Sequence, residues 1–202
     1  MEQAAITTSR SQPACAVCAG TNVALRYTVH GQSVRQCRSC GLRFFHPQPS
    51  DEPLAAIYTA DYFLGSESDE GRRRVAELKR STARRHVEHL ARQLGGATGR
   101  ILEIGCGKGE FLAEAQRAGF DVHGLEYSGD AAAAANLRLG DQRVRVGQVG
   151  VTPLEDAAFD AVVFFDVLEH VRDPKDFMQR IARTLKPGGL VMLTTPAVDT
   201  LS

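Results

Sequence analysis

A glycine loop behind a short apolar run constrains this chain more than any other feature. Residues 102–109 read LEIGCGKG, and glycines stand at positions 105, 107 and 109. A residue without a Cβ lets the backbone approach a ligand closely, so a strand, a tight turn and a helix start are predicted here. Sixteen residues after Gly109 comes Leu125-Glu126, which places an acid at the end of the next predicted strand. This layout indicates a sheet that binds a nucleotide-like cofactor.

The glycine spacing selects among such cofactors. Dinucleotide-binding loops read G-x-G-x-x-G and direct a helix N-terminus at a pyrophosphate, whereas this loop reads G-x-G-x-G and is followed by Glu110. A carboxylate in the first helical turn repels a pyrophosphate but tolerates a ligand without phosphate, such as S-adenosylmethionine. Glu126 would then bind the ribose hydroxyls, and Glu103 would lie near the ammonium group of the ligand.

Four segments in the same order resemble the class I S-adenosylmethionine-dependent methyltransferases. They are LEIGCGKG (102–109), GLEYS (124–128), FDAVVFFDVLEHV (159–171) and LKPGGLVMLTTP (185–196). The resemblance implies an enzyme with an α/β fold, a Rossmann-like parallel sheet with helices on both faces, and S-adenosylmethionine as methyl donor. The alternative is another doubly wound domain in which the glycine turn only packs a helix on a strand.

The resemblance also implies a cofactor site across the carboxyl ends of the first, second and fourth strands. It assigns cofactor contacts to Glu103, Gly105, Cys106, Gly107, Gly109, Glu126, Tyr127, Gln148, Asp166 and Val167. Cys106 is expected to be a small neutral filler beside the cofactor. Many relatives carry an acid near the adenine after the third strand, whereas this chain offers only Gln148 or backbone there.

Glu169 and His170 are the candidate catalytic residues, because they follow the fourth strand, where the methyl group would be presented. Methyl transfer from a sulfonium depends mainly on alignment and exclusion of water, and a base is an addition. Histidine is the side chain suited to accept a proton at neutral pH. In the alternative interpretation, this pair opens a short helix and only fixes the loop.

Two C-x-x-C pairs near the N-terminus indicate a metal site. The ligands would be Cys15, Cys18, Cys37 and Cys40, and eighteen residues separate the two pairs, a spacing typical of four-thiolate zinc. So short a module buries too little apolar surface to be stable alone, which makes the metal structural. Two disulfides, or iron in a rubredoxin-like site, are the alternatives. The expected module is a small β zinc ribbon in front of the α/β domain.

The periodicity predicts the remaining elements. Two short strands are expected at 22–29 and 33–36 around a His30-Gly31 turn, then an extended proline-rich linker from Leu42 that leads to Tyr58–Phe63. Apolar residues at spacings of three and four predict an amphipathic helix over 69–94 that covers the sheet. Further strands are predicted near 100–104, 121–126, 143–148, 160–166 and 190–195, with helices near 109–118, 130–139 and 174–185.

The domain boundaries follow from these elements. We divide the chain into a zinc ribbon at 1–50, a linker and amphipathic helix at 51–97, and a cofactor-binding methyltransferase core at 98–202. Class I methyltransferases usually continue for two strands beyond the fifth, whereas this sequence stops at Ser202. We therefore expect a core truncated after the fifth strand, whose apolar edge could pair with a second copy.

Composition limits the partners and the compartment. The sequence has 43% hydrophobic residues and no segment that would span a membrane, and its first fourteen residues lack a signal peptide, so a cytoplasmic location is expected. The net charge is zero, with 14 basic against 9 acidic residues in positions 1–100. This mild excess does not by itself favour nucleic acid as a partner.

The order of cysteine ribbon, proline-rich segment and core resembles a bacterial group that includes sugar C-methyltransferases and other enzymes of glycan or secondary-metabolite pathways. This implies a small-molecule acceptor, above all a nucleotide-linked or lipid-linked sugar. The basic helix at 69–94 could attract a phosphorylated acceptor, although a solvated helix face is the simpler interpretation. The alternatives are a ribosomal-RNA base methyltransferase with a zinc ribbon and a non-catalytic remnant that binds cofactor or a partner.

Overall fold

The computed structural model describes residues 13–48, 68–96 and 98–196. These residues form two compact units, a small sheet that carries the paired cysteines and an α/β domain. The predicted Tyr58–Phe63 segment lies outside the described residues. No helix in the described ranges has the length and apolar character needed to cross a membrane.

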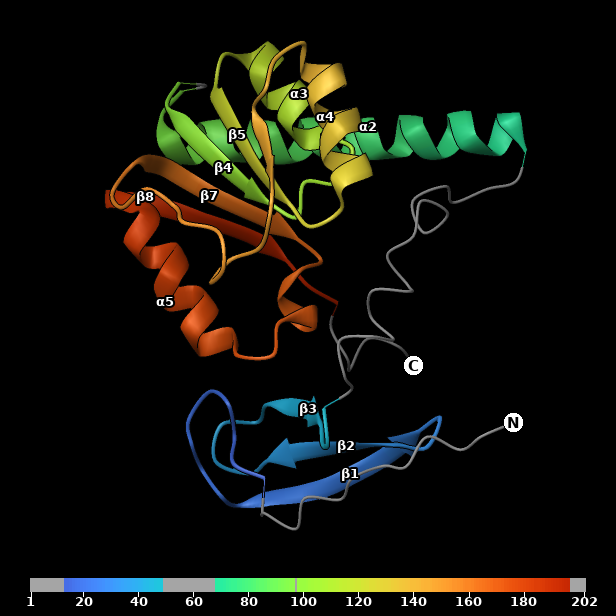
Figure 1. The fold of residues 1–202 in the computed structure, drawn as a ribbon, viewed down its shortest axis with the longest axis vertical. Helices are drawn as coiled ribbons and strands as arrows, with labels where there is room; N and C mark the ends of the chain where they lie inside the picture. The colour runs from blue at the N-terminus through green and yellow to red at the C-terminus, as the bar shows by residue number, and fades with distance from the viewer. Residues whose placement is uncertain (1–12, 49–67, 97, 197–202) are drawn as a thin grey trace. The chain divides into compact units, whose positions relative to one another are not determined.

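The first unit is a three-stranded antiparallel sheet in the order β1-β2-β3 (Figure 1). β1 (Val23–Val29) and β2 (Gln32–Cys37) confirm the two predicted strands, and the turn between them has positive φ at His30 and Gly31, as a two-residue hairpin requires. β3 (Arg43–Phe45) corrects the prediction of an extended linker, because these residues pair with β2 before the prolines begin. A third strand stabilises a hairpin that is marginal alone.

The second unit has a parallel sheet of five strands in the order β6-β5-β4-β7-β8. Its strands are β4 (Arg100–Ile104), β5 (Asp121–Glu126), β6 (Val144–Val146), β7 (Phe159–Phe165) and β8 (Leu185–Thr194). Its helices are α2 (Asp69–Leu94), α3 (Glu110–Ala118), α4 (Gly129–Leu139) and α5 (Pro174–Thr184), with a 3-10 turn at Leu168–His170. The predicted elements are confirmed, but β6 is shorter and β8 begins five residues earlier, where an irregular register first pairs Leu185 with Phe159.

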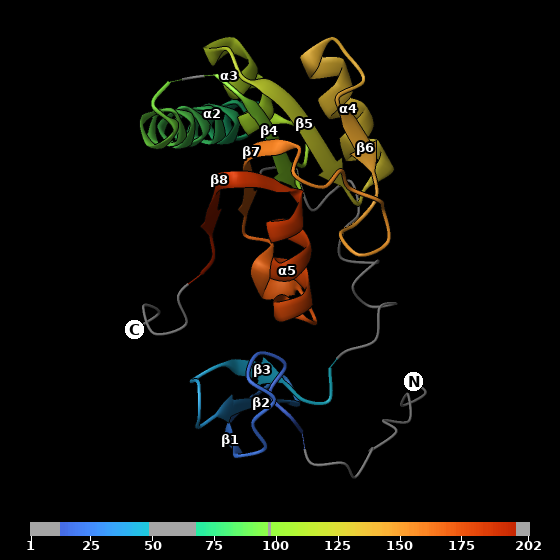
Figure 2. The same ribbon diagram turned by 90° about the vertical axis from the view of Figure 1, so that its left-hand side faces the viewer.

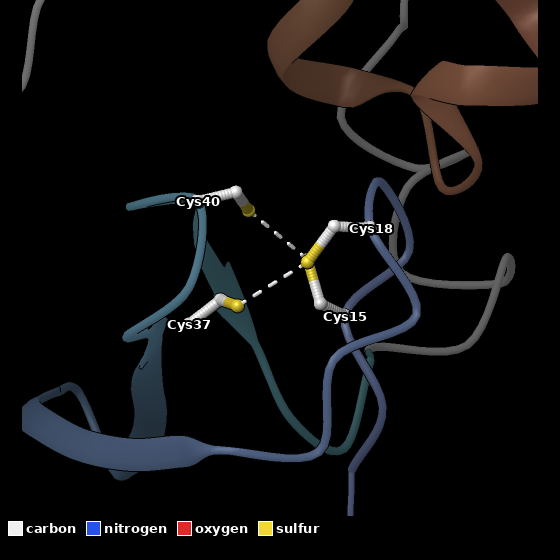
Figure 3. A group of neighbouring side chains, drawn as sticks. All are labelled: Cys15, Cys18, Cys37 and Cys40. Atoms are coloured by element: carbon white, nitrogen blue, oxygen red, sulfur yellow. Dashed lines mark hydrogen bonds between the residues drawn. The ribbon is translucent and has the colours of Figure 1, made fainter.

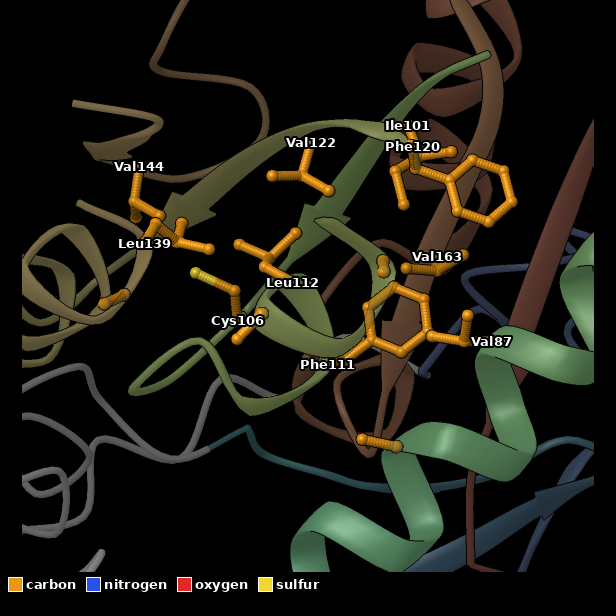
Figure 4. Packing of buried hydrophobic residues seen from close by; sticks show 14 of the residues in the cluster. Val87, Ile101, Cys106, Phe111, Leu112, Phe120, Val122, Leu139, Val144 and Val163 are labelled. Atoms are coloured by element: carbon orange, nitrogen blue, oxygen red, sulfur yellow. The ribbon is translucent and has the colours of Figure 1, made fainter. Parts of the chain in front are cut away.

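Helices cover both faces of this sheet (Figures 1 and 2), which confirms the predicted α/β class. On one face, α2, α3 and α4 enclose a core that includes Val87, Phe111, Leu112 and Val122 (Figure 4). On the other face, α5 packs Phe177 against Phe164, with ring centroids 5.3 Å apart. Apolar strands buried on both faces are what a parallel sheet requires.

α2 is a 26-residue helix of which only the C-terminal half packs on the sheet. The Ser68 side chain caps its start, and Gly95 ends it in a left-handed conformation. Val87 and Leu90 are buried, whereas Leu78 is 63% exposed, so the prediction that the whole apolar stripe covers the sheet is wrong for the first half. A five-residue strand spans about 16 Å, the rise of about eleven helical residues. The first half of α2 therefore extends past the sheet (Figure 1).

The direction of α2 decides which edge it passes. α2 ends at Gly95 and β4 begins at Arg100, so the C-terminal end of α2 lies at the edge where the strands begin. Its first half consequently extends beyond the carboxyl ends of the strands. In an open α/β sheet that is the edge where ligands bind.

Candidate functional site

The topology gathers the predicted site at the carboxyl edge of β4, β5 and β7. From β4 the chain builds β5 and β6 on one side and then crosses over to β7 and β8 on the other. The connections after β4 and β7 therefore lead to opposite sides of the sheet, and such a switch point is the usual ligand position in open α/β sheets. The glycine loop, Glu126 and Asp166 all lie at the ends of these strands.

Two glycines of the loop, Gly105 and Gly109, have no space for a side chain. Gly105 and Gly109 both have positive φ, at 69° and 75°. A Cβ on Gly105 would lie 2.7 Å from Cγ2 of Val167, and one on Gly109 would lie 3.0 Å from Cβ of Ala135. The Gly105 amide donates to the Leu125 carbonyl at 2.8 Å, which ties the loop to the end of β5. The loop therefore presents bare backbone in front of α3.

Glu126 is fixed by two backbone donors. Its Oε2 accepts a hydrogen bond from the Gly107 amide at 2.8 Å, and its Oε1 accepts one from the Ser128 amide at 2.9 Å. The side chain is buried, yet each carboxylate oxygen retains a lone pair with which to accept a ligand hydroxyl. Sequence analysis missed Ser128, although a serine just before a helix is a typical N-cap and its Oγ does accept from the Ala131 amide. The arrangement holds Glu126 beside the loop.

Glu103 is a buried carboxyl group with an unsatisfied oxygen. The residue is 4% exposed, and within the part of the chain that the structure describes its Oε2 has no hydrogen-bond partner. Burial, followed by the charges of Glu110 and Glu126, raises the pKa of Glu103 well above its ordinary value. An unpaired buried polar atom is costly. A cationic donor from a ligand would remove this cost.

The loop after β7 is tied to the end of β8. Asp166 has a φ of 54°, a strained conformation for a residue with a side chain. Its Oδ1 accepts from Oγ1 of Thr194 at 3.2 Å, and Oε2 of Glu169 accepts from Oγ1 of Thr195 at 3.2 Å. Sequence analysis did not identify these threonines, because strand order is not visible in the sequence. They fix two predicted site residues from a neighbouring strand.

His170 is the more accessible of the two candidate catalytic residues. Its side chain is 46% exposed, and its Nε2 lies 3.9 Å from Oε1 of Glu169. Both residues belong to the 3-10 turn at the carboxyl edge. The arrangement is compatible with proton transfer and with a structural turn alike, so the catalytic role stays a prediction.

The other predicted contacts follow the ends of β5, β6 and β7. Tyr127 follows β5 and is 58% exposed, while the exposed Gln148 follows β6. Val167 is partly buried and packs on the core beside α5. Their contacts with a cofactor stay predictions.

Cys106 faces inward, away from solvent. It belongs to the core that α3 and α4 cover (Figure 4), and burial raises the pKa of its thiol. A Cβ on Gly124 of β5 would lie 2.9 Å from Sγ of Cys106, from Cδ1 of Leu112 and from Cγ2 of Val144. A thiol with a raised pKa is a poor nucleophile. Cys106 therefore acts as packing in this structure.

These residues fit S-adenosylmethionine. The loop offers bare backbone, and three carboxyl groups surround it, those of Glu103, Glu110 and Glu126. Arg138 pairs with Glu110 at 3.1 Å, which weakens but does not reverse the acidic character of the site. A ligand with sulfonium and ammonium charges suits such a site better than a polyphosphate does. The unpaired Oε2 of Glu103 supplies the acceptor that an ammonium group needs.

The second candidate site is the cysteine cluster of the first unit (Figure 3). The sulfur atoms of Cys15, Cys18, Cys37 and Cys40 all lie within 4.8 Å of one another. The closest pairs are 3.5 Å and 3.6 Å apart, well beyond the length of about 2.05 Å for a disulfide. All four are free thiols in the structure. Four sulfurs at this spacing match the ligand set of a tetrahedral metal site.

Two equivalent turns bring the thiols together. Ala19 and Gly41 each follow a C-x-x-C pair, and both have positive φ, at 57° and 82°. Each donates its amide to the carbonyl of the first cysteine of its pair, Ala19 to Cys15 at 2.8 Å and Gly41 to Cys37 at 2.9 Å. The small residues after each pair thus allow both turns to close on one centre.

The electrostatics of the cluster favour a cation. A hydrogen bond from the backbone of Cys40 is the largest contribution that lowers the pKa of Cys37 to about 6. The backbone of Leu42 acts on Cys40 in the same direction, but the thiols of Cys15, Cys18 and Cys37 and burial raise its pKa to about 12. One thiol therefore ionises readily and another resists, because adjacent thiolates repel each other. A bound divalent cation would stabilise all four thiolates.

Comparison with known proteins identifies relatives of the second unit. Residues 72–202 match a family described as a methyltransferase domain. The chain is 38% identical over 115 residues to the ubiquinone biosynthesis O-methyltransferase of Alkalilimnicola ehrlichii, covering 54% of this chain and 47% of that one. It is also 38% identical over 127 residues to an S-adenosylmethionine-dependent methyltransferase of Mycolicibacterium smegmatis, covering 59% and 47%. The chain thus spans about half the length of these relatives.

Solved structures support the same fold. A Pyrococcus horikoshii protein superposes with a TM-score of 0.54 at 22% identity, covering 71% of this chain and 65% of that chain. A Methanococcus maripaludis protein, assigned as an S-adenosylmethionine-dependent methyltransferase, superposes with a TM-score of 0.52 at 20% identity, covering 64% and 67%. The family match begins at residue 72 and so does not include the four cysteines.

Proposed function

The chain belongs to the methyltransferase domain family, and on this premise we propose that it transfers the methyl group of S-adenosylmethionine to a small molecule. The observation that carries the proposal is the buried, unpaired Oε2 of Glu103 beside the glycine loop. A protein that bound no cationic ligand here would gain nothing from a carboxyl group that costs stability when unpaired. A cofactor with an ammonium group would satisfy that oxygen.

The residues of the carboxyl edge would have different roles in cofactor binding and methyl transfer. Glu126 would accept the ribose hydroxyls, Glu103 would accept the ammonium group, and the glycine loop would let the cofactor approach the backbone. When bound, S-adenosylmethionine supplies an electrophilic methyl group. Glu169 and His170, the predicted catalytic pair, stand after β7 at the edge where the acceptor would meet the methyl group. Alignment at this edge would contribute most of the rate.

The acceptor we propose is a nucleotide-linked or lipid-linked sugar. Two observations support a phosphorylated small molecule with a hydroxyl group. α2 has eight basic residues against four acidic ones, and its first half passes the edge where the acceptor would bind. The relative from Alkalilimnicola ehrlichii is named an O-methyltransferase, which favours oxygen as the acceptor atom.

A methyl-transfer assay with labelled S-adenosylmethionine tests this proposal. We would compare nucleotide-linked sugars with the same sugars lacking phosphate, after measuring cofactor affinity by calorimetry. Transfer to the phosphorylated sugars alone would support the acceptor class. Cofactor binding without transfer to any hydroxyl compound would favour the non-catalytic remnant, and preference for NAD would refute the cofactor assignment.

Ribosomal RNA is the second candidate acceptor, because the basic residues of α2 would also suit a polyanion. Binding to RNA through phosphates weakens steeply as salt increases. Fluorescence anisotropy with a ribosomal RNA fragment at two salt concentrations would separate this candidate from a sugar. The overall charge of zero favours the sugar.

We also propose that the cysteine cluster holds one structural zinc ion. The donor set of four sulfurs leaves no open position for a water nucleophile, so the ion would stabilise the first unit and take no part in methyl transfer. Iron in the same ligand set is the alternative. Metal analysis of the purified protein distinguishes them, since an iron centre would be coloured and redox-active.

A further inference from the structure

His86 occupies a position on α2 that the apolar stripe would otherwise fill. It lies between the buried Ala83 and Leu90, three and four residues away, and next to the buried Val87. Such spacings put these side chains on one side of a helix. A polar ring here is unexpected for a residue that serves packing alone.

The ring of His86 lies flat on Phe165, the last residue of β7. The two ring centroids are 4.4 Å apart with planes 18° from parallel. Phe111 of α3 meets the same phenyl ring edge-on, at 5.2 Å and 61°. Phe165 directly precedes Asp166, so the imidazole is held at the carboxyl edge of the sheet, beside the loop that carries the predicted site residues.

The two ring nitrogens of His86 are available to a ligand. Across the described part of the chain neither ring nitrogen of His86 has a hydrogen-bond partner, and the residue is partly exposed. Burial is the largest cause that lowers the pKa of His86, followed by Arg85 and His89 on the same helix, while Asp166 acts in the opposite direction. The aromatic rings of Phe165 and Phe111 add no charge. The side chain is therefore neutral at pH 7 and able to accept a proton.

We propose that His86 faces the methyl acceptor and receives its proton. This inference rests on the proposed function. The hydroxyl proton of the acceptor passes to a ring nitrogen of His86 as the oxygen forms its bond to the methyl carbon. The carbon–sulfur bond breaks and leaves its electron pair on the sulfur, and the imidazolium later releases its proton to solvent. Charge and atoms balance without any further reactant.

Placement favours His86 over His170 for this role. His86 is clamped against Phe165 by α2 and has no competing partner among the described side chains, whereas His170 lies in an exposed turn beside Glu169. A rigid, pre-positioned base loses less entropy in the reaction. Because α2 passes the carboxyl edge and His86 stacks on Phe165 at that edge, an acceptor bound along α2 would reach His86.

The first test uses S-adenosylhomocysteine as the probe and needs no acceptor. Histidine side-chain resonances are followed by NMR across a pH titration, with His89→Ala as the matched control one turn along the helix. We expect His86 to titrate below 6.5 and its resonances, not those of His89, to move when the probe binds. If calorimetry shows binding while His86 is unperturbed, the inference is wrong; if the probe does not bind at all, the proposed function fails first.

The second test compares His86→Phe, which preserves the stacking, with His89→Phe and His170→Ala. On the acceptor that the sugar panel identifies, His86→Phe should lower kcat by about 10²–10⁴ and remove the loss of rate at low pH, with unchanged affinity for the probe. His89→Phe should leave kcat and the affinity for the probe unchanged and should keep the loss of rate at low pH, shifted only because His89 no longer lowers the pKa of His86. A near-normal kcat in His86→Phe, or loss of the pH dependence in His170→Ala alone, would overturn the assignment.

Discussion

The cysteine cluster and the carboxyl edge are two sites built in opposite ways. The cluster takes four identical side chains from two short turns, whereas the edge collects different side chains from the ends of separate strands and from α2. In the first unit the described buried apolar residues are Cys15, Val34 and Cys37, two of which are proposed metal ligands. The second unit has cores on both faces of its sheet. Metal binding at the cysteine cluster should therefore stabilise the fold of the first unit. The carboxyl edge belongs to a fold that should be stable without its cofactor.

Removal of the metal should give the largest effect and the sharpest test of this contrast. Structural zinc contributes about 10–16 kcal/mol to small zinc-finger folds at neutral pH. Cys37→Ser or a strong chelator should therefore unfold the first unit and leave the second intact. The amide NMR signals of residues 13–48 would collapse while those of β4 to β8 persist. Cys106→Ala, a cysteine outside the cluster, should keep its metal. A first unit that stays folded without metal would contradict the proposal that only this unit depends on its ligand to fold.

Loss of Glu126 should weaken cofactor binding without unfolding the second unit. Two charge-assisted hydrogen bonds to the ribose would disappear in Glu126→Ala, a cost of about 1.5–3 kcal/mol, or about 10- to 150-fold in affinity. Calorimetry with S-adenosylhomocysteine measures it. Ser128→Ala is the control, because it removes the side-chain cap of α4 but keeps the amide that binds Glu126. Unchanged affinity in Glu126→Ala would refute the ribose assignment.

Glu103→Gln should weaken binding and yet stabilise the ligand-free protein. Burial raises the pKa of Glu103 in the folded state, so its contribution to stability is full below the unfolded-state pKa of 4.5 and is lost as pH rises through the folded-state value. Because glutamine does not ionise, Glu103→Gln keeps its stability as the pH rises. The variant should therefore resist urea better than wild type at pH 8 but not at pH 4. Affinity for S-adenosylhomocysteine should fall by about tenfold.

Glu114→Gln is the matched comparison for that experiment. Burial opposes ionisation of Glu114, but Arg117 and Arg84 outweigh it and lower the pKa of this carboxyl group. Its stabilising contribution is present above the unfolded-state pKa and lost as pH falls through the folded-state value. Glu114→Gln should therefore destabilise the protein at pH 8. Equal responses of the two variants would show that burial does not distinguish the two carboxyl groups.

The smallest expected effect concerns self-association. We propose that two copies of the chain associate through β8. This strand is the edge of the described sheet, and its Val191 and Leu193 are 36% and 37% exposed. A lysine in an edge strand discourages pairing with another chain. Val191→Lys should lower the dimer fraction in sedimentation while changing monomer stability by about 0.5 kcal/mol or less. A wild-type protein that is monomeric at every concentration would contradict the proposal.

Local patterns predicted from the sequence are the ones that agree with the structure. The four cysteines are recognisable from their spacing, and the strand predicted near 160–166 from its apolar run, because both signals lie within a few neighbouring residues. What depends on distant segments was missed. The pairing of β3 with β2, the exposure of Leu78 and the stacking of His86 on Phe165 follow from strand length and order, which no local pattern contains.

Gly124 restricts which substitutions the core can accept. The space that its missing side chain leaves is filled from three sides, by Cys106, Leu112 and Val144. An alanine at position 124 would therefore be tolerated only after one of those neighbours had become smaller, and a larger residue at 106 only while 124 stays glycine. Homologous chains with alanine at position 124 should therefore have a smaller residue at 106, 112 or 144, so the second strand and these neighbours would have to evolve together.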